Sequence, residues 1–373
     1  MKKILCTYLS ILLIIITVTG CSLDRTEPTN SPSALSPTPT ASAFTSDSAS
    51  NDSPKIDLSS LICNEEGSVL CENWLEKVVV PEWYDSSDWC THIVEDNDAC
   101  YYICDEGIRY RNNKENKERL IIKSPNIVGL ILYNGELYFN YNETHIIRYS
   151  KKQTLEEIWN VSESCVADDD QRIYEFCFGD NGNILLYNTP ISIIKIDPET
   201  RKSTVLLDDC CSFAVLNEGT YFIEHSSRAF AIMFKERETK TVSSLRYDTS
   251  HSDINDPLKF RYDDVVAFQG NIYYTIRTPI AKLCKLSGSP DTDEVIFDGC
   301  EEFQIKHVSN DSLFFVAKKQ NEDVFTLYRY KNEKIDVLLS QEKLDTLIFT
   351  KKGIYYLSED AGNKLTFFSV SIV

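Results

Sequence analysis

The stretch NGELYFNY, residues 134–141, decides the fold because variants of it return along the whole sequence. Its Asn-Gly turn leads into a short run of aromatic and aliphatic residues, which is typical of a hairpin strand. One variant precedes it, ACYYIC (99–104), and five follow: NGNILLY (181–187), NEGTYFI (217–223), QGNIYYT (269–275), NDSLFFV (310–316) and KKGIYYL (351–357). Successive variants are 36 to 52 residues apart. A repeat of this length with a turn and an aromatic strand predicts the blades of a β-propeller.

The repeats predict an all-β chain, since no long stretch has the 3.6-residue period of a helix. Each repeat holds about four strands, and the clearest set is FQIKHV (303–308), SLFFVAK (312–318), FTLYRYK (325–331) and IDVLLS (335–340). Seven repeats predict seven blades, with six or eight as the alternatives because the third and fourth repeats are irregular.

The last repeat ends one strand short of a blade, while LEKVVV (75–80) reads as a strand that belongs to no repeat. We expect this N-terminal strand to complete the last blade, because closing the ring removes an exposed sheet edge.

Residues 1–20 have the pattern of a secretory signal, with Lys2 and Lys3 before an apolar run and small residues at its end. The sequence VTGC (18–21) resembles a bacterial lipobox, so we expect cleavage before Cys21 and a lipid on its thiol. The alternative is a single uncleaved membrane anchor, which the shortness of the apolar run disfavours. Residues 21–54 are predicted to be a disordered Ser/Thr/Pro tether, and residues 55–373 the propeller domain.

The net charge of -19 excludes some partners. So acidic a surface repels nucleic acid and anionic lipid headgroups. We therefore expect no nucleic-acid partner, and contact with the membrane only through the lipid on Cys21. The signal and the lipobox predict an extracytoplasmic location, and we expect a monomer.

The repeated phrases GELYF, HIIRY, GNIYY, TLYRY and GIYYL resemble those of clostridial-type β-propeller lipoproteins. These are described as carrying a domain similar to the propellers of low-density-lipoprotein-receptor-related proteins, and no function is assigned to them. The resemblance covers about residues 90–373 and implies the propeller fold. The Tyr-Trp-Thr-Asp signature of the receptors is missing, so the resemblance implies no receptor ligand.

No sequence motif for a nucleophile, a phosphate loop, a zinc site or a calcium loop is present. We therefore expect no catalytic residues, no metal and no cofactor, and loop calcium would have no motif to support it. Eleven cysteines lie beyond Cys6 and Cys21. They either pair with neighbours, such as Cys165 with Cys177 or Cys284 with Cys300, or fill the blade interiors as small hydrophobic residues. We favour the second interpretation, because the repeats do not share cysteine positions.

Loops from the outer strand of one blade to the inner strand of the next gather on one face of a propeller, and here they are rich in aromatic and acidic residues. Such side chains stack on sugars or cations and orient hydroxyl groups. The hypothetical ligand face consists of Trp83, Tyr84, Trp89, Asp169, Tyr247, His251 and Tyr262. For any single residue, ordinary solvated loop chemistry is the simpler explanation.

These features favour a cell-surface lipoprotein whose propeller is a non-enzymatic binding module for an extracellular protein, peptide or glycan. The alternative is an extracellular carbohydrate-active enzyme, a hydrolase or lyase, that uses loop carboxylates. A structural or sensory accessory of a neighbouring membrane system is a third interpretation. A deep, acid-lined central pocket would favour the enzyme.

Overall fold

The computed structural model describes residues 56–63, 69–80, 91–163, 172–179, 181–188, 192–208, 210–226, 229–247, 262–277, 280–289, 292–344, 346–358, 361–362 and 364–370. The chain divides into two units, Met1–Ser50 and Asn51–Val373, and every described residue belongs to the second unit. In this part of the chain, no helix has the length and apolar character needed to cross a membrane.

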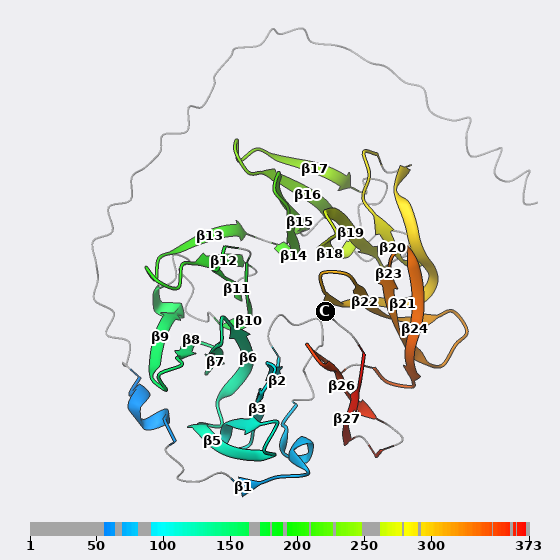
Figure 1. Ribbon diagram of the computed structural model, residues 1–373. Helices are drawn as coiled ribbons and strands as arrows, with labels where there is room; N and C mark the ends of the chain where they lie inside the picture. Colours follow the sequence, from blue (N-terminus) through cyan, green and yellow to red (C-terminus); the bar gives the residue numbers. More distant parts are fainter. Residues whose placement is uncertain are drawn as a thin grey trace, which may run out of the picture. The chain divides into compact units, whose positions relative to one another are not determined.

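The first three sheets are antiparallel and follow the chain order (Figure 1). The first consists of β2 (Ile93–Glu95), β3 (Ala99–Cys104), β4 (Gly107–Asn112), β5 (Lys117–Lys123) and, beyond β5, β1 (Val69–Leu70). The second consists of β6 (Ile127–Tyr133), β7 (Glu136–Tyr141), β8 (His145–Tyr149) and β9 (Leu155–Asn160). The third consists of β10 (Ile173–Phe178), β11 (Ile184–Asn188), β12 (Ser192–Ile196) and β13 (Ser203–Asp208).

The remaining sheets continue this pattern, with one fusion. The fourth consists of β14 (Cys210–Val215), β15 (Gly219–Ser226), β16 (Ala229–Glu236) and β17 (Val242–Tyr247). A seven-stranded sheet follows, with β18 (Tyr262–Phe268), β19 (Asn271–Ile276), β20 (Ala281–Lys285), β21 (Glu294–Val308), β22 (Leu313–Lys319), β23 (Phe325–Lys331) and β24 (Lys334–Gln341). The last consists of β25 (Leu347–Thr350), β26 (Gly353–Ser358) and β27 (Lys364–Phe368).

The seven repeated phrases all form the second strand of a four-strand unit or of the last sheet. These strands are β3, β7, β11, β15, β19, β22 and β26. The turn before β7 has Asn134 and Gly135 at φ of 51° and 74°, the left-handed conformation that a tight hairpin needs and that Asn and Gly adopt most readily. The aromatic or aliphatic residue at the middle of each phrase, such as Phe139 or Phe315, is buried in six of the seven strands. The sequence prediction of an all-β repeat is confirmed.

β21 explains the fusion of two four-strand units into one sheet. It is 15 residues long; its first part pairs with β20 as an outer strand, and its second part pairs with β22 as an inner strand. Cys300 lies at the change of partner, opposite Ala281 on one side and Lys319 on the other. Separating the two units gives seven in all, which supports the predicted blade count; the count itself stays a prediction.

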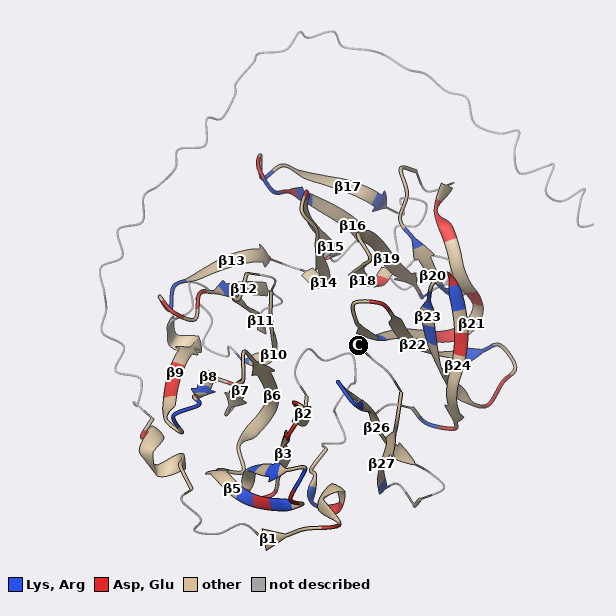
Figure 2. Ribbon diagram, in the orientation of Figure 1, with Lys and Arg blue, Asp and Glu red and all other residues tan. Residues whose placement is uncertain are grey.

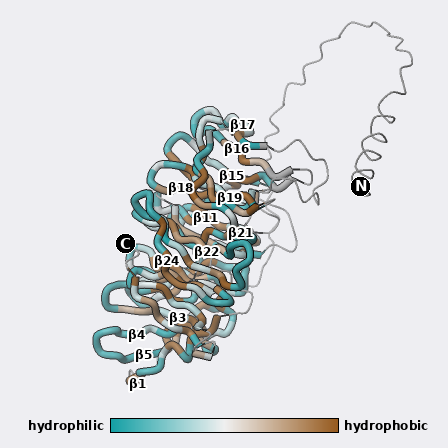
Figure 3. Tube along the Cα trace, turned by 90° about the vertical axis from the view of Figure 1, so that its right-hand side faces the viewer, coloured by the Kyte–Doolittle hydropathy of each residue, from teal (hydrophilic) through white to brown (hydrophobic). Residues whose placement is uncertain are grey.

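Buried hydrophobic side chains fill the spaces between successive sheets. One cluster, for example, joins Val94 and Ile108 of the first sheet to Leu130 and Phe139 of the second. Corresponding clusters join each later pair of units, and one joins the last sheet to the first. Hydrophobic residues therefore lie along the strands between the sheets, and hydrophilic residues lie at the turns (Figure 3). Charged residues lie mostly on turns and on outer strands such as β5, β9 and β21 (Figure 2). This is the arrangement of a β-propeller.

The predicted closing strand at residues 75–80 is wrong. Trp74–Lys77 form a 3₁₀ turn, η2, whose backbone bonds are local, from Glu76 N–H to Asn73 O and from Val78 N–H to Leu75 O. The turn places the ring of Trp74 between Tyr102 of β3 and Tyr355 of β26, at centroid distances of 5.2 and 5.7 Å. Burying this ring fixes the segment between the first and last sheets, so among the described residues the last sheet keeps three strands.

Polar contacts strengthen the same seam. The buried carboxylate of Glu118 on β5 accepts hydrogen bonds from Lys77 of η2 and, at 2.6 Å, from the Tyr102 hydroxyl. Glu95 of β2 accepts a 2.9 Å hydrogen bond from the hydroxyl of Thr350 on β25. Side-chain contacts, rather than a shared strand, therefore join the first sheet to the last.

The cysteines whose side chains are described are not joined by disulfides. Cys63, Cys71, Cys100, Cys104, Cys177, Cys210, Cys284 and Cys300 are all free. Cys100, Cys104 and Cys284 are buried in the clusters between sheets, as the interpretation of small hydrophobic residues requires. The alternative pair Cys284–Cys300 is wrong; Cys165 lies outside the described residues.

This arrangement predicts the result of a thiol titration. We expect at least the eight described cysteines to react in the denatured, unreduced protein, because each is free in the fold. A colorimetric thiol assay in guanidinium without reductant measures the number. Only one or two reactive thiols would mean that disulfides hold the blades together.

The seam also predicts the effect of removing the Trp74 ring, whose residue is 8% exposed. Trp74→Ala should lower the free energy of unfolding by about 3–5 kcal/mol, because it leaves a cavity between two sheets. Urea denaturation measures the loss. The control Val337→Ala changes a residue of β24 that is 65% exposed and should cost ~0.5 kcal/mol. Similar losses for the two variants would contradict a closure that depends on Trp74.

Candidate functional site in the central channel

The predicted ligand face lies largely outside the described residues. Trp83, Tyr84, Trp89, Asp169 and His251 are among the residues not described, as is Cys21. Tyr247 is the last residue of β17, and only its backbone is described. The structure therefore leaves the convergence of these side chains as a prediction.

Tyr262 is the member of that set whose side chain is described, and it packs in the core. It begins β18, is 7% exposed, and its ring meets Tyr274 edge to face at a centroid distance of 5.7 Å. The strand pairing of Tyr262 with Ile276 holds the ring inward. Its environment in the fold is therefore that of a packing residue.

The first strands of the sheets surround the middle of the ring of sheets, a region that we call the central channel (Figure 1). Two cavities lie among these strands. The larger, of about 420 Å³, lies among β10, β11, β12, β14, β18 and β21; we call it the Glu175 cavity. The second, of about 400 Å³, lies among β2, β6, β25 and the turn after β21; we call it the Glu95 cavity. His307 of β21 lines both, so it stands between the two.

The Glu175 cavity has polar groups on two of its walls. Glu175 comes from β10, and Asp264 and Lys306 come from β18 and β21. Asp264 Oδ2 accepts a 3.4 Å hydrogen bond from Ile305 N–H, which places the carboxylate beside the strand that carries Lys306. Lys306 is only 6% exposed, and both it and Asp264 also line a third cavity of about 370 Å³, which Arg277 and Glu302 border.

Aromatic rings accompany Glu175. Tyr187 on β11 is its direct cross-strand partner, so the two side chains share one face of the sheet. Phe213 on β14 lines the cavity as well, and both rings pack against the cluster formed by Ile193 and Phe222. Where the third and fourth sheets meet, the cavity is thus lined by the carboxylate of Glu175 and the rings of Tyr187 and Phe213.

Two groups in the cavity have pKa values far from their ordinary range. Burial raises the pKa of the Cys177 thiol to about 12, so at neutral pH it is protonated and not nucleophilic. Burial lowers the pKa of His307 to about 4, and its ring stacks on Phe349 at 4.7 Å. The imidazole is therefore neutral at pH 7 and a weak base.

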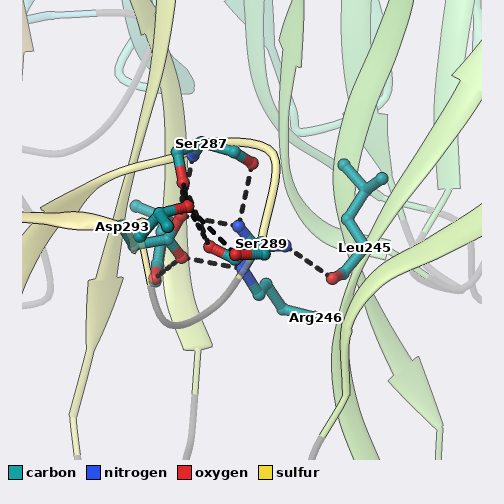
Figure 4. A network of polar contacts seen from close by, with 7 residues as sticks. Leu245, Arg246, Ser287, Ser289 and Asp293 are labelled. Carbon is teal, nitrogen blue, oxygen red and sulfur yellow. Dashed lines mark hydrogen bonds and ion pairs between the residues drawn. The ribbon is translucent and has the colours of Figure 1, made fainter.

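A buried ion pair fixes the outer ends of two sheets that form the cavity walls (Figure 4). Arg246 of β17 donates from Nε and Nη2 to the two carboxylate oxygens of Asp293, at 2.7 and 2.6 Å. Asp293 also accepts from the Tyr274 hydroxyl at 2.6 Å and from Ser287 N–H at 2.7 Å. The guanidinium in turn donates to the carbonyl oxygens of Leu245 and Ser287. The network joins the fourth sheet to the next one.

Sequence reasoning missed the channel residues because they lie within ordinary strands rather than in loops. The sequence does mark these residues, because the first strand of a repeat carries a polar residue among apolar ones. Examples are Glu175 in IYEFCF and Lys306 in FQIKHV. Period-two alternation placed them on one face of a strand. Which strands shared a cavity required the order of the sheets.

No protein-family model matches this chain, and no curated protein matches it. Among solved structures, the tricorn protease is similar over 79% of this chain and 34% of its own, with 13% identity and a TM-score of 0.54. An oligogalacturonate lyase from Vibrio parahaemolyticus matches over 80% and 94% of the two chains, with 10% identity and a TM-score of 0.49. A chain of the nidogen/laminin complex matches over 66% and 93%, with 13% identity and a TM-score of 0.39.

At such low identity these likenesses concern the fold alone. The structural neighbours include propeller proteins, which agrees with the sheet order and the clusters between sheets. The chain is a β-propeller.

The Arg246–Asp293 pair predicts a pH-dependent stability. Burial raises the pKa of Asp293, but hydrogen bonds from Arg246, Tyr274 and Ser287 outweigh it and hold the pKa below its ordinary value of 3.8. The stabilisation is therefore fully present above pH about 4 and is lost as the carboxylate is protonated. Asp293→Asn should lower the free energy of unfolding by about 3 kcal/mol at neutral pH, and by less as the pH falls below about 4.

Urea denaturation at neutral and acidic pH measures this difference. The control is Asp336→Asn, which breaks the 2.7 Å pair with Arg329 at a site where Asp336 is half exposed. It should cost about 1 kcal/mol or less, because solvent screens the pair. Equal losses in the two variants would show that the buried network does not hold the sheets together.

Proposed function

We propose that this protein is an extracytoplasmic lipoprotein, attached to the cell membrane through Cys21, whose propeller is a non-enzymatic binding module for an extracellular protein, peptide or glycan. Residues 1–20 and the lipobox-like VTGC support export and lipidation. The resemblance to clostridial-type propeller lipoproteins points in the same direction.

The observation that carries the binding role is the chemistry of the Glu175 cavity. It has the size and mixed polar and aromatic lining of a ligand pocket. Its thiol is held protonated and its imidazole neutral with a low pKa, which is the opposite of the tuning that a nucleophile or a general base needs. A cavity of this kind is suited to holding a ligand unchanged.

One observation favours the enzymatic alternative. Glu175 and Asp264 line the same cavity, as a pair of carboxylates does in glycoside hydrolases and some lyases. Lys306 also lines that cavity, so it is not purely acidic. An assay for release of reducing ends or unsaturated products from acidic and neutral glycans decides between the two. Product formation that Asp264→Asn abolishes would replace the binding proposal.

The binding role predicts a ligand-dependent thermal shift of the full chain. A panel of cell-wall and host-type glycans, with calcium and EDTA as separate arms, should contain a compound that raises the unfolding midpoint, because binding to the folded state stabilises it. If the loop face holds the ligand, the combined substitution of Trp83, Trp89 and Tyr247 by Ala should abolish the shift.

The control for this experiment is Phe367→Ala, which removes an exposed aromatic ring from β27. Cross-linking on intact cells tests for a protein ligand. A partner protein that cross-links to the unchanged chain but not to the triple variant would be the ligand in place of a glycan. Ligand and partner binding that survive the triple variant unchanged would contradict the loop face. A chain that incorporates no labelled palmitate in cells, or one whose labelling survives Cys21→Ser, would contradict the lipid anchor.

A further inference from the structure

The Glu175 cavity combines features that select one charge of ligand. Its described lining carries two carboxylates, Glu175 and Asp264, one ammonium group, Lys306, and an imidazole that is neutral at pH 7. The net charge of the lining is therefore negative, within a chain whose total charge is -19. A concave site of this sign concentrates cations.

The charged residues of the cavity come from two different sheets. Asp264 and Lys306 belong together, because both line the third cavity as well and Asp264 contacts the backbone next to Lys306. Glu175 lies three inner strands away from Lys306 along the channel, on β10 rather than β21. Asp264 thus lies beside the strand that carries Lys306, and Glu175 lies in the strand pair that carries Tyr187.

Those rings complete the recognition of a cation. Tyr187 is directly opposite Glu175 in the sheet, and Phe213 reaches the same cavity from the neighbouring sheet. The negative faces of aromatic rings attract ammonium groups, most strongly where the groups lose water. A carboxylate beside two rings neutralises the charge while the rings contact the carbon atoms around it.

We propose that the Glu175 cavity binds a small organic ammonium ion, with its charged nitrogen at Glu175, Tyr187 and Phe213. The wall of Asp264 and Lys306 then faces the polar remainder of the ligand. The cavity volume of about 420 Å³ suits a small molecule rather than a polymer. This inference deepens the proposed binding function and rests on it, but it uses the channel rather than the loop face.

The test is isothermal titration calorimetry of the full chain in detergent with choline as the probe. The matched probe is dimethylbutanol, the uncharged carbon isostere of choline, and ethylammonium tests a primary amine. We expect the two cations to bind and the isostere to bind about tenfold more weakly or not at all, because the attraction depends on charge.

Glu175→Gln keeps the shape of the side chain and removes its charge, and should weaken choline binding about tenfold. Tyr187→Leu removes one ring and should weaken binding in the same direction. Glu115→Gln is the matched control, since Glu115 is exposed and pairs with Lys117 far from the cavity; it should leave binding unchanged. Circular dichroism and the unfolding midpoint of Glu175→Gln check that the variant is folded.

The proposal is overturned if neither cation binds at millimolar concentration, if choline and its isostere bind equally, or if Glu175→Gln binds choline as the unchanged chain does. Its failure is distinguishable from failure of the binding function. A glycan or protein ligand that still depends on Trp83, Trp89 and Tyr247 would leave the propeller a binding module with its site on the loop face.

Discussion

Each sheet of this protein has two apolar faces, and the fold has to bury both of them. Phe139 and Tyr138 are neighbours on β7, yet one packs toward the first sheet and the other toward the third. A sheet that buries both faces needs a neighbour on each side. A row of such sheets leaves two apolar faces uncovered at its ends unless the ends meet. The contact between the first and last sheets is therefore a requirement of the apolar pattern.

The seam at this contact shows how the requirement is met without a shared strand. The ring of Trp74 fills the space between Tyr102 and Tyr355, and Glu95 and Glu118 add buried hydrogen bonds at the strand edges. Side-chain packing of this kind has the density of a core and so resists opening. It also leaves the N-terminal segment in contact with both sheets, so the segment that follows the predicted tether is part of the ring closure.

A closed ring turns the inner strands toward a common channel, and this is where polar side chains appear inside the fold. The polar side chains that line the Glu175 cavity are Glu175, Asp264, Lys306 and His307. Burial holds the pKa of His307 at about 4. The Arg246–Asp293 network fixes the outer ends of two adjacent sheets, so the cavity walls do not depend on the inner strands alone.

Local sequence is enough to specify the strands, the repeat and the burial of the second strands, because turn residues and period-two patterns are local properties. The phrase NGELYFNY needs only its own Asn134 and Gly135 to form a hairpin. Local reasoning failed at residues 75–80, where three consecutive valines favour a strand, because the deciding contact is the burial of Trp74 against side chains of the first and last sheets. The same limit hid the channel. The alternation in IYEFCF places Glu175 on one face of a strand, but only the order of the sheets around the ring brings it into one cavity with Lys306, which is 131 positions later in the sequence.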